Sequence, residues 1–178
     1  MLKEKHVSAA RWAVCVALVA TLFAVSPAAA SDENDDSLVG RVRDVNDRFR
    51  DVSIAVAEGY KPMPCVSGAD GGAMGIHYVN AKLLATDAID IRHPQAVMYE
   101  PKPDGRMVLV AVEYITSKGP ASLEGQLFNF TSAPNRYGLP AFYALHVWAW
   151  KPNPKGAFAD MNPNVTCENA IGTSMDRD

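Results

Sequence analysis

The chain has 178 residues, of which 17 are Lys or Arg and 20 are Asp or Glu, so its formal net charge is −3 at pH 7. The basic residues are scattered and outnumbered, which argues against nucleic acid or an anionic lipid surface as a partner. The length suits one domain with a sizeable hydrophobic core.

Residues 1–30 have the features of a secretory signal peptide. Lys3, Lys5 and Arg11 precede or enter the apolar run WAVCVALVATLFAV, and Ala28 and Ala30 form the small-residue pattern of a cleavage site. The run is shorter than the ~20 residues of a membrane-spanning helix, which disfavours an uncleaved anchor. Cleavage leaves 148 residues with 14 basic and 19 acidic side chains, a net charge of −5. The sequence therefore predicts a soluble protein, periplasmic or secreted, without membrane contact after cleavage.

The mature chain is expected to begin with an acidic, disordered leader over residues 31–37, followed by a single globular domain over residues 38–178. Apolar residues at steps of four and three predict one long amphipathic helix at the start of this domain. They are Leu38, Val42, Val45, Phe49, Val52 and Val56. Ser37 suits the N-cap of this helix, and Gly59 and Pro62 prevent its continuation.

After the helix the pattern changes to short runs rich in β-branched and aromatic residues. The runs are GIHYVN, AVMYEP, MVLVAVEYI, QLFNF and ALHVWAW. Such runs are typical of β-strands, and Asp104-Gly105 between the second and third predicts a tight hairpin. The predicted fold is α+β. It has one long N-terminal amphipathic helix packed on a curved, mainly antiparallel sheet, followed by an irregular, proline-rich C-terminal tail.

Two of the three cysteines remain after signal cleavage. Cys15 lies within the signal, whereas Cys65 and Cys167 lie in the mature chain. In an oxidising compartment two cysteines most simply pair, so a Cys65–Cys167 disulfide is predicted. The alternative is two independent buried thiols.

Strand alternation places three polar side chains on apolar faces. Glu113 is predicted to share its side with Met107, Leu109, Ala111 and Ile115. His146 is predicted to lie with Ala144, Trp148 and Trp150, and His77 with Gly75 and Val79, whereas Met74, Ile76, Tyr78 and Asn80 take the other side of their strand.

If His77, Glu113 and His146 face the same interior, they form a cluster of two histidines and one carboxylate. Imidazole nitrogens and a carboxylate oxygen suit a divalent transition metal such as Cu, Zn or Fe, and three protein ligands leave open positions. Met74 adds a thioether only if it departs from the alternation of its strand. The alternative is that each histidine is a core residue bonded to backbone or to a neighbouring side chain. His93, before a proline, is expected to be exposed and structural.

Hydrolytic and nucleotide-binding chemistry have less support. The sequence contains no Gly-x-Ser-x-Gly elbow, no phosphate-binding Gly-Lys-Ser/Thr loop and no dinucleotide fingerprint. Both mature cysteines are assigned to the disulfide, which disfavours a Cys/His nucleophile. These motifs therefore identify no catalytic residue.

Several segments carry a resemblance to a known group of proteins. They are AVAEGYKPMPCVS, GAMGIHYVN, HPQAVMYEP, MVLVAVEY and GLPAFYALHVWAWKPNPKGAFADMNPNVTC. With these motifs, which cover most of residues 55–167, the chain resembles a family of small exported bacterial proteins of unassigned function. The resemblance implies export to a bacterial envelope and implies no activity.

Together these observations predict an exported soluble binding protein with a pocket for a transition metal or a small ligand between helix and sheet. One alternative is a metal-assisted hydrolase or isomerase in which Glu113 is the general base. Another is a structural or interaction module without a small-molecule site.

Overall fold

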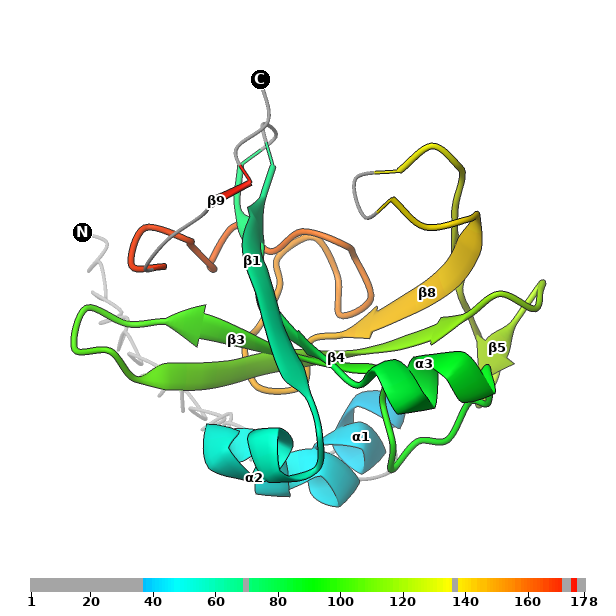
Figure 1. The fold of residues 1–178 in the computed structure, drawn as a ribbon, viewed down its shortest axis with the longest axis horizontal. Helices are drawn as coiled ribbons and strands as arrows, with labels where there is room; N and C mark the ends of the chain where they lie inside the picture. Colours follow the sequence, from blue (N-terminus) through cyan, green and yellow to red (C-terminus); the bar gives the residue numbers. More distant parts are fainter. Residues whose placement is uncertain (1–36, 69–70, 136–137, 171–173, 176–178) are drawn as a thin grey trace, which may run out of the picture. The chain divides into compact units, whose positions relative to one another are not determined.

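A curved sheet of seven strands forms the centre of the fold (Figure 1). Its strands, in spatial order, are β7 (Asn129–Thr131), β8 (Phe142–Val147), β4 (Met107–Thr116), β3 (Ala96–Pro101), β2 (Ala73–Val79), β1 (Lys61–Ser67) and β9 (Ser174–Met175). All neighbours are antiparallel except β1 and β9, which are parallel. A separate small hairpin pairs β5 (Ser122–Leu123) with β6 (Gln126–Leu127). The predicted curved, mainly antiparallel sheet is confirmed.

The computed structural model describes residues 37–68, 71–135, 138–170 and 174–175. All of them belong to one compact unit, Asp32–Asp178. The predicted signal peptide and all of the predicted leader except Ser37 lie outside the described residues. None of the helices in this part of the chain combines the length and the hydropathy needed to cross a membrane.

The prediction of one long N-terminal helix is wrong. The segment forms α1 (Leu38–Asn46), a short 3₁₀ helix η1 (Asp47–Arg50) and α2 (Val52–Ala57). Asp51 adopts an extended conformation, and its carboxylate accepts a hydrogen bond from the Ser53 N–H at 2.9 Å, so it caps a new helix. Asp and Asn side chains compete in this way with helical backbone bonding. The polar residues at 46–51 therefore divide the helix although the apolar period continues through them.

Two other local predictions from the sequence are confirmed. The Ser37 hydroxyl accepts a hydrogen bond from the Gly40 N–H at 3.1 Å and caps α1. The turn between β3 and β4 is a tight hairpin in which Gly105 has a φ of 81° and the Lys102 N–H donates to the Arg106 carbonyl at 2.9 Å. A positive φ favours glycine at this position.

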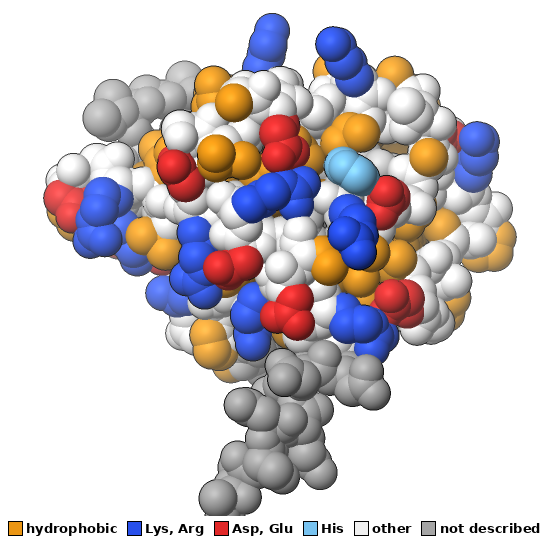
Figure 2. Space-filling view, turned by 90° about the horizontal axis from the view of Figure 1, so that it is seen from below, with side chains coloured by type: hydrophobic (Ala, Val, Ile, Leu, Met, Phe, Trp, Pro, Cys, Tyr) orange, Lys and Arg blue, Asp and Glu red, His pale blue; other side chains and the backbone are white. Residues whose placement is uncertain are grey.

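The N-terminal helices cover one face of the sheet, below it in Figure 1. Val42, Phe49 and Ala55 are fully buried there. They pack into one core cluster with side chains of the sheet, among them Ile76, Tyr78, Val97, Tyr99, Val112, Tyr114, Leu145 and Val147. The outer surface on this side mixes acidic and basic side chains (Figure 2). The N-terminal segment carries the ion pairs Arg48–Glu58 and Arg50–Asp47.

The C-terminal segment is irregular as predicted and is fixed to the sheet at several points. Cys167 forms the predicted disulfide with Cys65 of β1, with an S–S distance of 2.07 Å. Asn162 is fully buried and exchanges backbone hydrogen bonds of 3.1 Å with Ala73 of β2. The Glu100 carboxylate of β3, which is almost fully buried, accepts a bond from the Thr166 N–H at 3.3 Å. These contacts hold residues 162–167 against β1, β2 and β3.

Asp87 fixes the short helix α3 (Ala81–Thr86) to the end of β4. Its carboxylate accepts hydrogen bonds from the Ser117 hydroxyl (2.5 Å), the Thr116 hydroxyl (2.7 Å) and the Ser117 N–H (2.6 Å). These bonds, with the Ser117 hydroxyl contributing most, lower the pKa of Asp87 to about 2. The ionised form is therefore the one that stabilises the fold.

Asp87→Asn is expected to lower the free energy of unfolding near neutral pH by about 1–2 kcal/mol. Because the pKa of Asp87 is lower in the folded protein than in the unfolded chain, its contribution is complete above about pH 4 and is lost as the pH falls towards about 2. Urea unfolding at both ends of this range measures the difference between wild type and variant. The difference should shrink in acid, and an equal difference at both pH values would contradict the assignment.

Candidate metal centre

The structure brings together the three residues that the sequence singled out. His77, Glu113 and His146 lie on β2, β4 and β8 and face away from the N-terminal helices. Glu113 and His146 are direct partners across β4 and β8. The cluster lies on the face of the sheet opposite the N-terminal helices, because strand alternation gives the helix side to residues such as Tyr78 and Tyr114. Leu84 of the short helix α3 lines a cavity beside the cluster.

His77 reaches Glu113 across the intervening strand β3. The β3 residue paired with Glu113 is Ala96, whereas His77 itself pairs with Met98. The small Ala96 side chain leaves room above it, so the longer side chains from β2 and β4 meet over β3. This geometry depends on the strand order and on the register between strands, and neither can be read from the sequence.

The three side chains are close enough to act together. His77 Nε2 lies 3.5 Å from Glu113 Oε2, and His146 Nε2 lies 3.5 Å from Glu113 Oε1. One ligand atom from each residue lies within 4.8 Å of the other two. Ligands about 2.1 Å from one tetrahedral ion are roughly 3.4 Å apart, which is close to the 3.5 Å that separates each imidazole nitrogen from Glu113.

All three side chains are buried, with exposed fractions of 5% for His77, 6% for Glu113 and 4% for His146. Removing such groups from water is costly unless polar partners or a metal compensate. Each oxygen of Glu113 faces a different imidazole, so the carboxylate lies between the two rings. The donor set of two imidazoles and one carboxylate fits a transition metal.

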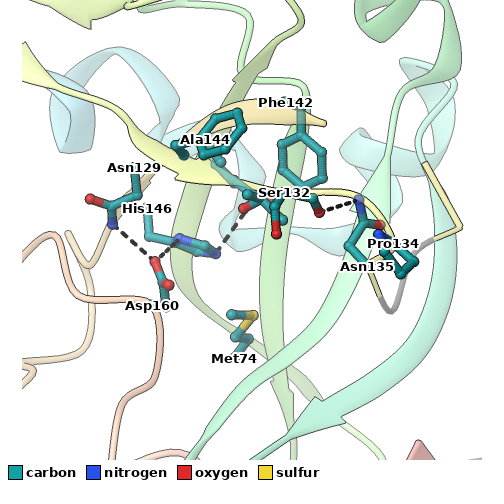
Figure 3. A pocket seen from close by; sticks show the side chains of 12 residues that line it. Met74, Asn129, Ser132, Pro134, Asn135, Phe142, Ala144, His146 and Asp160 are labelled. Carbon is teal, nitrogen blue, oxygen red and sulfur yellow. Dashed lines mark hydrogen bonds and ion pairs between the residues drawn. The ribbon is translucent and has the colours of Figure 1, made fainter. Parts of the chain in front are cut away.

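Asp160 is a further residue of the site that sequence reasoning missed. Its Oδ1 lies 3.3 Å from His146 Nδ1 and accepts a hydrogen bond from Asn129 Nδ2 at 3.1 Å (Figure 3). A carboxylate at one ring nitrogen orients an imidazole and leaves the other nitrogen for a metal. Asp160 lies in the irregular C-terminal segment, where no strand or helix period marks its direction.

Two cavities adjoin the cluster and differ in character. The larger, of about 450 Å³, is lined by Glu113 and His146 together with polar residues that include Asn129, Ser132, Asn135 and Asp160 (Figure 3). The smaller, of about 130 Å³, is lined by His77 and Glu113 together with mainly apolar residues, among them Val66, Val79, Leu84, Ile115 and Phe142. Glu113 therefore lies at the boundary between a polar and an apolar cavity.

Two irregularities of the sheet change which side chains share a face. The β3–β4 register shifts after Met98, so Leu109 joins the core on the helix side while Ala111 stays on the side of Glu113. The β1–β2 register shifts at Met74, and Met74 lines the larger cavity with Glu113 and His146. The predicted placements of Leu109 with Glu113 and of Met74 away from the histidines are therefore wrong.

The structure also tests the predicted positions of His93 and Trp150. His93 is half-exposed and its Nδ1 lies 2.7 Å from Asp90 Oδ2, as expected for a structural surface residue. Trp150 does not share the side of His146, because it lies beyond the end of β8 and packs against the core on the helix side.

Comparison of the sequence with protein-family models, with curated proteins and with solved structures finds no match. The resemblance to small exported bacterial proteins therefore stays a prediction.

Proposed function

We propose that this protein is an exported binding protein that holds one transition metal ion between His77, Glu113 and His146. The observation that carries the proposal is the convergence of three buried ligand atoms, from three strands, within 4.8 Å of one another. Imidazole and carboxylate ligands suit Cu, Zn or Fe. A bound ion would also offset the cost of burying these polar groups.

The larger cavity supports a role in which a small ligand reaches the metal. Three protein ligands leave at least one position open in a tetrahedral site. The cavity of about 450 Å³ borders Glu113 and His146, so a ligand within it lies beside that position. The polar lining from Asn129 and Ser132 favours a ligand with hydrogen-bonding groups.

The arrangement of Glu113 supports a ligand role over the alternative of a general base in a metal-assisted hydrolase or isomerase. Both of its oxygens face imidazole nitrogens at 3.5 Å. A general base needs an oxygen within hydrogen-bond reach of a substrate or a water. An oxygen that binds the same ion as the two histidines is not available for that task.

The compartment proposed is the periplasm or the exterior of the cell. The signal-like residues 1–30 motivate this proposal. The Cys65–Cys167 disulfide supports it, because disulfides persist in oxidising compartments.

Metal content tests the proposal directly. Protein that begins at Ser31, purified from the periplasm, is expected to carry about one transition metal ion per chain by elemental analysis. After the metal is removed with a chelator, titration with Zn(II) or Cu(II) should restore one equivalent. Binding should raise the free energy of unfolding by ~2.7 kcal/mol at a free metal concentration 100 times the Kd.

Glu113→Gln, which keeps the shape of the side chain and removes its charge, is the matched control and should bind metal far more weakly. Wild-type protein that neither carries nor takes up metal would refute the proposal and favour a structural module.

A further inference from the structure

We infer that the Met74 thioether is the fourth protein ligand of this site, that it takes the position which the three-ligand site leaves open to the larger cavity, and that the site therefore holds copper as Cu(I). The inference rests on the proposed function, since it identifies the metal of the same centre. It rests on the backbone at residues 74 and 75, on the cavity that Met74 lines, and on the chemistry of the resulting ligand set.

The backbone turns Met74 out of the regular alternation of β2. Val66 of β1 pairs with Gly75 and Ser67 pairs with Ala73, so Met74 is an extra residue without a partner in the β1–β2 register. Gly75 has a φ of 90°, and a Cβ at this position would lie 2.5 Å from the Tyr99 carbonyl oxygen. Only glycine fits such a position. The bulge places Met74 on the same face as His77, three residues further along the strand.

The side chain of Met74 lies beside the proposed ligands. Met74 is 2% exposed and lines the cavity that also borders Glu113 and His146. Figure 3 shows Met74 and the His146 ring on the same side of the sheet, across the cavity from one another. An ion held at His146 Nε2 and Glu113 would therefore face the wall of the cavity that Met74 forms.

The resulting ligand set distinguishes between metals. A thioether is a soft ligand that favours Cu(I), whereas the protein ligands of Zn are thiolate, imidazole and carboxylate. Charge favours the same ion. Glu113 contributes one negative charge and the imidazoles and thioether none, so Cu(I) makes the buried centre neutral, whereas a divalent ion leaves it positive. A buried net charge is costly. The Asp160 carboxylate lies 3.3 Å from His146 Nδ1 but is 54% exposed, so water screens part of its charge.

Met74 also packs with Met98, Ala111 and Trp148, so the test must separate a ligand from a packing residue. Met74→Leu keeps the size and the apolar character and removes the sulfur. Met98→Leu is the matched control, because Met98 is fully buried in the same cluster but is not among the residues that line the two cavities beside the site. Cu(I) affinity is measured anaerobically against a chromophoric Cu(I) chelator, and Zn(II) affinity against a zinc indicator.

Met74→Leu is expected to lower Cu(I) affinity at least ~10-fold, which is about 1.4 kcal/mol, and to change Zn(II) affinity less than ~3-fold. Met98→Leu should change neither. X-ray absorption of Cu(I)-loaded wild type should contain one copper–sulfur scattering path, and this measurement needs no variant to fold. Both cysteines of the mature chain are disulfide-bonded, so that sulfur is a methionine.

Three results would overturn the inference while leaving the proposed function intact. They are an unchanged Cu(I) affinity in Met74→Leu, an equal loss of Zn(II) affinity in that variant, and an equal loss of Cu(I) affinity in Met98→Leu. Wild-type protein that binds neither Cu(I) nor Zn(II) overturns the proposed function and this inference together.

Discussion

Replacing either His77 or His146 with alanine is expected to abolish stoichiometric metal binding. Each histidine supplies one of the three buried ligand atoms that lie within 4.8 Å of one another, and the loss of one leaves only two of these three. We expect the affinity to fall at least ~100-fold, which is about 2.7 kcal/mol. Isothermal titration of metal-free protein measures this loss, and elemental analysis of the purified variants should give much less than one ion per chain.

His93→Ala is the control for these two variants. His93 is half-exposed, interacts with Asp90 and lies in the connection between α3 and β3, so its removal should leave metal binding unchanged. If His77→Ala and His146→Ala both retain wild-type affinity while folded, the two histidines are core residues. If His93→Ala alone loses binding, the site lies at the surface and the buried cluster is not the metal centre.

Strand alternation was sufficient to predict that His77, Glu113 and His146 lie on apolar strand faces, because it holds wherever a strand is regular. Their convergence depends on the strand order β2-β3-β4-β8, on the register between the strands, and on the small Ala96 between His77 and Glu113. These are long-range properties that no local pattern encodes. The prediction of one cluster was therefore a hypothesis that required the sheet to be known.

Local patterns failed where a strand was irregular or absent. Alternation assigned Met74 to the wrong face because one glycine with a positive φ inserts an extra residue into β2. The glycines of GADGGAMG gave a signal for this, since an isolated glycine within a strand pattern often marks a bulge. Asp160 had no such signal, because its segment has no repeating conformation. The position of the segment is set by the disulfide and by the contacts of Asn162 and Glu100.

The N-terminal helical segment, on the other side of the sheet, is a second place where the local sequence pattern did not predict the structure. The apolar steps of four and three are compatible both with one continuous helix and with two short helices joined by a 3₁₀ turn. The buried Asn46 side chain favours the two short helices. It donates hydrogen bonds of 2.9 Å to the carbonyls of Val42 and Ile91. The second of these bonds ties the end of α1 to the loop before β3, and α2 then starts in a new direction from its Asp51 cap.

Phe49→Ala is expected to lower the free energy of unfolding by ~3–5 kcal/mol, the range for a fully buried phenylalanine. Phe49 is 0% exposed, and its ring packs edge-on against Tyr60 with centroids 5.3 Å apart. The Tyr99 hydroxyl donates to the Phe49 carbonyl at 2.7 Å, which fixes η1 on the sheet. Truncation removes these apolar contacts and leaves a cavity, and both effects lower stability. Urea unfolding followed by tryptophan fluorescence measures the loss.

Val56→Ala makes this experiment a test of the divided helix. In one continuous helix Val56 lies seven residues after Phe49, on the same face, and its truncation would also be costly. In the structure Val56 is 56% exposed because α2 starts anew at Val52 and turns Ala55 towards the core instead. Val56→Ala should therefore change stability by less than ~0.5 kcal/mol. A loss above ~1 kcal/mol in this variant would favour the continuous helix, since truncating a buried valine removes both apolar contacts and packing volume.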